Sequence, residues 1–84
     1  MMVKIGDITI EAGSAREIVE EIYKQRIWQE NLSFEDKLEI LIDSLNRFTD
    51  LDISKHIVLA GNNDEVKASR LIAALKDKEI LEEI

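Results

Sequence analysis

The side chains that could support catalysis are few, and their spacing does not bring them together. His56 is the only histidine and the chain has no cysteine, so a transition-metal site would lack its usual imidazole and thiolate ligands. A Ser-His-Asp triad would depend on His56 alone, and its place in an apolar segment favours a surface or structural role. Adjacent acids such as Glu20-Glu21 and Glu82-Glu83 diverge on a helix, where facing residues are three or four apart. We therefore predict a non-enzymatic protein with no catalytic residue, metal or cofactor.

The glycines and the short acidic segments do not form a ligand-binding motif either. Gly6, Gly13 and Gly61 are isolated, whereas a phosphate-binding loop needs several glycines within a few residues. Asp50-Leu51-Asp52 is too short for a calcium loop, which requires more ligands and an internal glycine. The sequence therefore indicates a function in binding through the protein surface.

Length and charge limit what the chain can bind. The 84 residues carry a net charge of −7, and a chain of this size forms one domain, residues 1–84, with little interior space for a substrate. Negative charge repels phosphate backbones and favours partners with a basic surface, although a solvated acidic surface alone would look the same. The apolar runs are too short to span a bilayer and residues 1–7 lack the layout of a signal peptide, so we expect a cytosolic protein without membrane contact.

Alternating apolar and polar residues predict a β-hairpin at the N-terminus. Val3-Lys4-Ile5 and Ile8-Thr9-Ile10 flank Gly6-Asp7, in which glycine supplies the positive φ of a two-residue turn. A hairpin alone is marginally stable in water, so its apolar side must lie on helices.

Two long helices are expected after the hairpin. Ser14 and Glu17 form a capping box at the start of the first, and Ser33 caps the second. The apolar stripe of the first helix consists of Ala15, Ile18, Val19, Ile22, Tyr23 and Ile27. The second helix carries a heptad face of Phe34, Leu38, Leu41, Leu45 and Phe48, with Ile40 and Ile42 on either side.

The C-terminal third contains a short segment and a last helix. Ile53, Ile57 and Ala60 fit a short third helix that ends at Gly61 in the left-handed conformation, and a buried strand over residues 57–59 is the alternative. Asn63 or Asp64 caps the last helix, whose buried face consists of Ala68, Leu71, Ile72 and Leu75. The predicted fold is therefore α+β, an N-terminal β-hairpin packed on a bundle of three to four helices.

Residues 53–83 resemble the second half of a bacterial winged helix-turn-helix domain. The resemblance lies in a short helix, a glycine-containing turn and a second helix with Ser69-Arg70-Leu71-Ile72, although Glu79 stands where the family has glycine. It implies that Lys67, Ser69 and Arg70 face DNA. The resemblance covers about a third of the chain and leaves open whether the segment contacts DNA or a protein.

A second resemblance concerns the tripeptide Asp43-Ser44-Leu45. It is similar to the site at which acyl and peptidyl carrier proteins bear phosphopantetheine, which implies attachment at Ser44. In the carrier family the serine comes just after a loop with a glycine shortly before it, whereas Ser44 follows Ile40-Leu41-Ile42 on a predicted helix.

Tyr23, Trp28 and Ile40 are the candidate protein-contact residues. Trp28 would be exposed if the first helix continued past it, and would fold onto the second helix if the first ended near Arg26. Exposed tryptophan often anchors an interface. We expect a small cytosolic binding or regulatory protein, of the kind used as a bacterial or phage modulator, that contacts another protein or forms a homodimer. The alternatives are a helix-turn-helix DNA-binding regulator and a carrier-like protein modified at Ser44.

Overall fold

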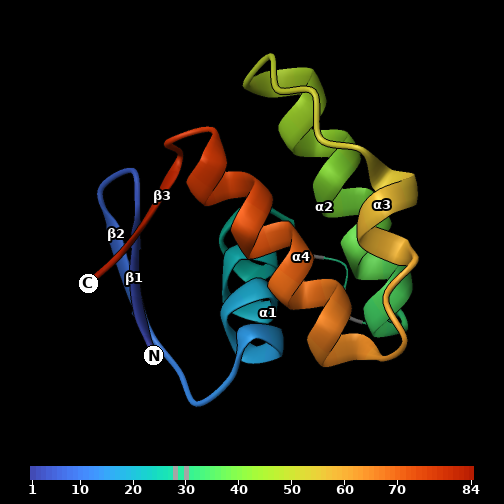
Figure 1. Cartoon of the computed structure of the whole chain (residues 1–84), viewed down its shortest axis with the longest axis horizontal. Coiled ribbons are helices and arrows are strands. Elements are labelled where there is room, and N and C mark those ends of the chain that lie inside the picture. The colour runs from blue at the N-terminus through green and yellow to red at the C-terminus, as the bar shows by residue number, and fades with distance from the viewer. Residues whose placement is uncertain (28, 30) are drawn as a thin grey trace.

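A small antiparallel sheet lies beside a group of helices (Figure 1). The computed structural model describes residues 1–27, 29 and 31–84. Strands β1 (Met2–Ile5) and β2 (Ile8–Glu11) form the predicted hairpin, and Gly6 in its turn has a φ of 58°. A third strand, β3 (Leu81–Glu83), pairs with the other side of β1, which gives the order β2-β1-β3.

Strand β3 was absent from the sequence prediction. The segment Leu81-Glu82-Glu83 has neither β-branched residues nor a clear alternation, so only its pairing with β1 makes it a strand. The chain reverses before it at Glu79, whose φ of 61° lies in the left-handed region. The N–H of Ile80 then donates to the Leu75 carbonyl at 2.9 Å, a bond typical of a helix that ends with a left-handed residue.

The described residues form four helices, and each begins at a polar cap. Helices α1 (Ala15–Arg26), α2 (Phe34–Phe48), α3 (Lys55–Leu59) and α4 (Asp64–Asp77) are preceded by Ser14, Ser33, Ser54 and Asn63. Each cap side chain accepts a hydrogen bond from the N–H three residues later, at 2.9–3.4 Å. The predicted caps Ser14, Ser33 and Asn63 are therefore confirmed.

The core lies where α1, α2 and α4 meet one another and the inner face of the sheet. In Figure 1, α4 runs in front of α1, with α2 and α3 beside them. None of the described helices is long and apolar enough to cross a membrane. The innermost side chains are Val3, Ile18, Val19, Leu38, Leu41, Ile42, Leu71 and Leu75.

Several details of the helical prediction were wrong. Phe48 is 72% exposed, because the C-terminal end of α2 projects from the group of helices (Figure 1). Ile57 is 61% exposed and Val58 is buried instead, because the buried Ile53 precedes the helix, so Ile53 and Ile57 do not share a helical face.

The predicted short third helix is confirmed, and the alternative strand over residues 57–59 is wrong because these residues are helical. The predicted left-handed conformation of Gly61 is also wrong. Gly61 is not among the residues with positive φ. A side chain at Gly61 would instead meet the Lys67 backbone N and the Val66 Cγ1 at 3.0 Å. Glycine is therefore suited to this turn by its small size, because α4 passes very close to it.

Candidate functional site: an apolar groove beside the hairpin

Of the three predicted contact residues, the two that the structure describes, Tyr23 and Ile40, do not form a surface patch. Tyr23 is only 2% exposed, and its hydroxyl donates to the Gln29 carbonyl at 2.7 Å. Its choice as a contact residue is therefore corrected, because α1 turns the ring into the core. Ile40 is half-buried against the core. Trp28 lies outside the described residues.

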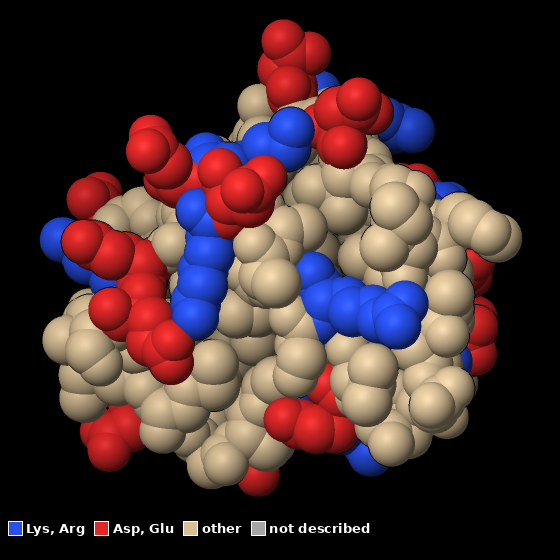
Figure 2. Space-filling model, viewed as in Figure 1, with Lys and Arg blue, Asp and Glu red and all other residues tan. Residues whose placement is uncertain are grey.

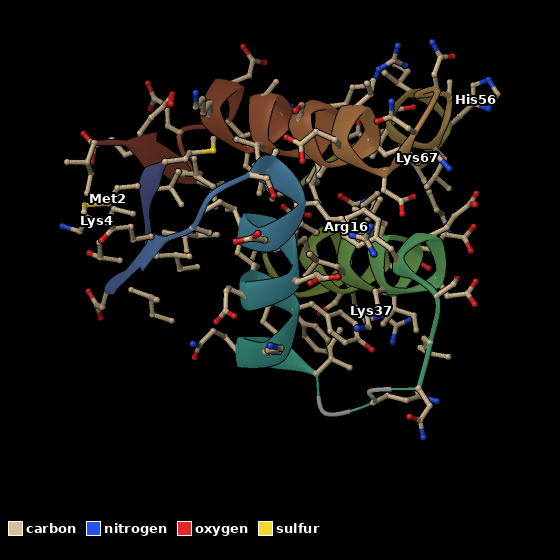
Figure 3. All side chains as sticks on the ribbon, turned by 90° about the horizontal axis from the view of Figure 1, so that it is seen from below. Met2, Lys4, Arg16, Lys37, His56 and Lys67 are labelled. Atoms are coloured by element: carbon tan, nitrogen blue, oxygen red, sulfur yellow. The ribbon has the colours of Figure 1, made fainter. Side chains whose placement is uncertain are left out.

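The helix-turn-helix residues lie on α4, but two of them are held by intramolecular contacts. Lys67 keeps only 13% of its side chain exposed and places Nζ 3.4 Å from a Glu35 carboxylate oxygen. Arg70 donates from Nη1 to the Ile57 carbonyl at 2.8 Å, and Ser69 is exposed. The labelled Lys67 lies between α4 and α2 (Figure 3). The basic side chains that the resemblance assigns to DNA contact therefore join elements of the fold: Lys67 links α4 to α2, and Arg70 links α4 to α3.

The acids at the start of α4 have a structural role. The Glu65 carboxylate accepts hydrogen bonds from the N–H groups of Ala15 and Arg16, both at 3.0 Å. Asp64 lies 3.4 Å from the Arg16 guanidinium. These N–H groups open α1 and have no partner within their helix, so Glu65 acts as a second cap supplied by another helix.

The other predicted residues take no part in a cluster. Ser44 is half-buried within α2, where its Oγ accepts a long, 3.5 Å hydrogen bond from Arg26. His56 is exposed on α3 and points outward (Figure 3). The described residues contain no group of three or more histidine, cysteine or acidic side chains placed to hold a metal ion.

A groove of about 500 Å³ opens between the tip of the hairpin and the C-terminal ends of α1 and α2. We call it the hairpin groove. Its walls are mainly aliphatic, and its polar residues are Asp7, Gln25, Arg26 and Thr49. The apolar lining consists of Ile5, Ile8, Ile10, Ile22, Leu45 and Ile80.

Local structure explains why this groove stays open. The two-residue turn places Ile8 opposite Ile5 at the hairpin tip, and α1 ends at Arg26 beneath it. The apolar side of the hairpin, which includes Ile8, was expected to lie on helices, but Ile8 is 38% exposed. Leu45 and Thr49 line the groove, and the exposed Phe48 lies between them in the sequence. The groove therefore has one exposed apolar side chain in its wall, Ile8, and a second, Phe48, next to its lining residues.

The hairpin groove differs from a second cavity of similar volume in the described structure. That cavity, of about 540 Å³, lies at the junction of α4 and β3 and is lined by Lys4, Lys76, Glu79 and Glu82 among others. Figure 2 shows acidic and basic side chains interspersed over the sheet and the end of α4. Charged side chains there are well solvated, whereas the groove exposes aliphatic carbon to water. The hairpin groove is therefore the better candidate for a binding site.

Comparison with known proteins adds no further assignment. The chain matches no protein-family model, and neither a curated protein nor a solved structure shows significant similarity to it.

Proposed function

We propose that this chain is a small, non-enzymatic, cytosolic binding protein that acts through protein–protein contact, and that the hairpin groove receives apolar side chains of its partner. The observation that carries the proposal is an aliphatic groove, open to water, with the exposed side chain of Ile8 in its wall. Filling the groove would remove this surface from water, which is the main favourable contribution in most protein–protein association.

The charge of the chain favours a basic partner. The net charge is −7, whereas the groove itself is lined by one acid, Asp7, and one base, Arg26, so the preference for a basic partner comes from the chain as a whole. Complementary charge raises the association rate and disfavours acidic partners, and it makes binding sensitive to salt. We expect the affinity for the partner to fall as the salt concentration rises.

Protein contact is a better match to the structure than DNA contact. DNA binding by α4 would use Lys67 and Arg70, and both already bond within the molecule. Opening those contacts would add a cost to an interaction that the overall negative charge already disfavours.

Two isoleucine substitutions test the proposal. Ile8→Glu places a charge in the groove, and Ile57→Glu places the same charge on the exposed face of α3, away from the groove. Each variant is first checked for wild-type helix content and thermal unfolding. Tagged wild type and both variants are then used to capture partners from nuclease-treated and untreated lysate of the source organism, with quantitative mass spectrometry as the readout.

The comparison of the two variants decides between the surfaces. We expect one protein to be captured by wild type and by Ile57→Glu, with or without nuclease, and to be lost with Ile8→Glu. Retention by Ile8→Glu together with loss by Ile57→Glu would move the site to α3 and α4. Capture that disappears on nuclease treatment would instead favour the DNA-binding alternative.

A further inference from the structure

The outer edge of the hairpin carries backbone groups without a partner in the sheet. The N–H of Ala12 donates to the Met1 carbonyl at 2.9 Å. Hydrogen-bonded pairs alternate along an antiparallel ladder, so Ile10 and Ile8 also form their backbone hydrogen bonds with β1. Thr9 and Glu11 lie between them, and their N–H and C=O groups therefore point away from β1. Among the described residues, none donates to or accepts from these backbone groups.

The other strand of the hairpin has no free side. The N–H of Ile84 donates to the Met2 carbonyl at 3.0 Å, so the second side of β1 is used by β3. The side chains of Met2 and Lys4 point away from the helices (Figure 3), which leaves the inner face of the sheet to the apolar side chains. Strand addition within this sheet is therefore possible beside β2.

Strand β2 lacks most of the features that usually protect an edge. The chain has no proline, and Ile8-Thr9-Ile10 is a run of β-branched residues. Glu11 is the one charged residue of the strand. Natural edge strands are commonly protected by lysine, proline or a bulge, because an exposed regular edge pairs with other chains.

The open edge and the hairpin groove adjoin each other. Ile8 and Ile10 belong to β2 and also line the groove. Side chains alternate between the two faces of a sheet, so a strand placed beside β2 would direct every second side chain to the face on which the groove lies. One extended segment can therefore pair with the free backbone groups of β2 and place its apolar side chains in the groove.

We propose that the partner binds as an added β-strand along β2, through an extended segment with apolar side chains at alternate positions and lysine or arginine between them. This inference rests on the proposed function of the groove. The apolar positions face Ile8, Ile10 and the groove, and the basic positions lie beside Thr9 and Glu11 on the outer face. Opposite charges on neighbouring strands stabilise their pairing.

A second copy of this chain is a poorer occupant of the same edge. Pairing β2 with its own copy would bring together two chains that each carry a net charge of −7. It would also add two glutamates, one Glu11 from each copy, to the joined edge. A basic segment of another protein removes this repulsion.

Peptide selection followed by backbone substitution tests the proposal. A displayed library of random peptides is selected against the full chain and counter-selected against Ile8→Glu, and the enriched peptides are synthesised. Their dissociation constants are measured with wild type, Thr9→Pro and Thr9→Val. Proline removes only an N–H that points away from β1, a position at which edge strands tolerate it, and valine retains that N–H.

We expect an alternating apolar and basic pattern among the selected peptides. Thr9→Pro should weaken their binding about tenfold or more, and Thr9→Val by less than about threefold, because one backbone hydrogen bond is lost only with proline. Binding should also slow hydrogen exchange at the Thr9 and Glu11 amides. Glu11→Lys should weaken the same peptides.

A second measurement leaves the protein unchanged. Methylating the peptide amides one at a time should abolish binding at every second residue and be tolerated at the residues between. Equal tolerance at all positions, or full affinity for Thr9→Pro, would overturn strand addition. If those peptides still require Ile8, the groove remains the binding surface. Absence of any peptide that depends on Ile8 would overturn both proposals.

Discussion

The two edges of the sheet differ in sequence and in what surrounds them. The β2 edge reads Ile8-Thr9-Ile10-Glu11 and adjoins an aliphatic groove. The β3 edge reads Leu81-Glu82-Glu83 and adjoins α4, where Lys76 Nζ lies 2.5 Å from the Glu83 carboxylate. Acidic side chains and an ion pair make the β3 edge a poor template for another strand. The same sheet therefore has one edge suited to binding and one that is protected.

The difference follows from how each strand is connected. Strand β3 follows α4 after a short turn, so the helix stays close to it. Strand β2 instead leads away through residues 12–14 to the start of α1. The hairpin tip is left without a covering helix because α1 has ended at Arg26. Both connections are three residues long, so the direction in which the chain leaves the sheet and the end of α1, and not connection length, leave the β2 edge open.

The largest expected effect separates the two sides of β2. Ile10→Pro should lower the free energy of unfolding by about 4 kcal/mol, because it removes a hydrogen bond to β1, leaves a carbonyl unpaired and truncates a buried side chain. Thr9→Pro should cost less than about 1 kcal/mol, because its N–H is not paired within the sheet. Urea unfolding of both variants measures the contrast. Equal costs would show that the assignment of the free edge is wrong.

Strand β3 should depend mainly on one side chain. Leu81 is buried on the inner face of the sheet, whereas Ile84 is exposed beyond the end of the strand. Leu81→Ala should reduce the free energy of unfolding by about 2–3 kcal/mol, and Ile84→Ala by less than about 0.5 kcal/mol. Denaturant titration at neutral pH gives both values. A large loss of unfolding free energy in Ile84→Ala would contradict the exposed position of the Ile84 side chain.

The turn into β3 should be improved by glycine at a single position. Glu79 adopts a φ of 61°, which glycine adopts with less strain, so Glu79→Gly should stabilise the protein by about 0.5–1 kcal/mol. Its neighbour Lys78 has a φ of −86°, and Lys78→Gly should be destabilising by about 0.5–1 kcal/mol. Thermal unfolding of the two variants should therefore shift in opposite directions. A shift of the same sign in both would contradict this explanation.

The smallest expected effect concerns the ion pair at the β3 edge. The hydrogen bond and charge of Lys76 hold the pKa of Glu83 below its ordinary value of 4.5. A carboxyl whose pKa is lowered by folding stabilises the protein above its unfolded-state pKa, and that contribution disappears as the pH falls through the lowered, folded-state pKa. An NMR titration of Glu83 should show the lowered value, and Lys76→Met should return it toward 4.5. An unchanged value in this variant would mean that Lys76 is not the cause.

Elements with strong local signals were predictable from the sequence. The hairpin was correct because glycine at the turn and alternating residues act over short distances. The starts of α1, α2 and α4 were correct because their caps bond within the same turn. The predicted burial of residues near helix ends, such as Phe48 and Ile57, was wrong. Periodicity shows which residues share a face, but not how far the covering elements extend.

The hairpin groove could not be identified from periodicity. Ile8 and Leu45 both occupy apolar positions of regular patterns, and such patterns predict burial. Phe48 continues the same face of α2 and is nevertheless exposed. The exposure of Ile8 depends on where α1 ends, and the space beside it depends on how the hairpin tip lies over the helices. A short apolar run therefore cannot distinguish a core residue from one that lines an open groove.

The sequence by itself determined the α+β class, the hairpin, the start of each long helix and the acidic charge, because these depend on neighbouring residues and composition. The tertiary structure alone decided that residues 81–83 pair with β1, that Glu65 caps α1, and that β2 keeps an open edge beside an aliphatic groove. Each of these features joins segments far apart in the chain. Strand pairing uses backbone groups, which these residues carry alike, and the Glu65 cap joins a carboxylate to N–H groups about 50 positions away. Local sequence therefore leaves both unspecified until the elements pack together.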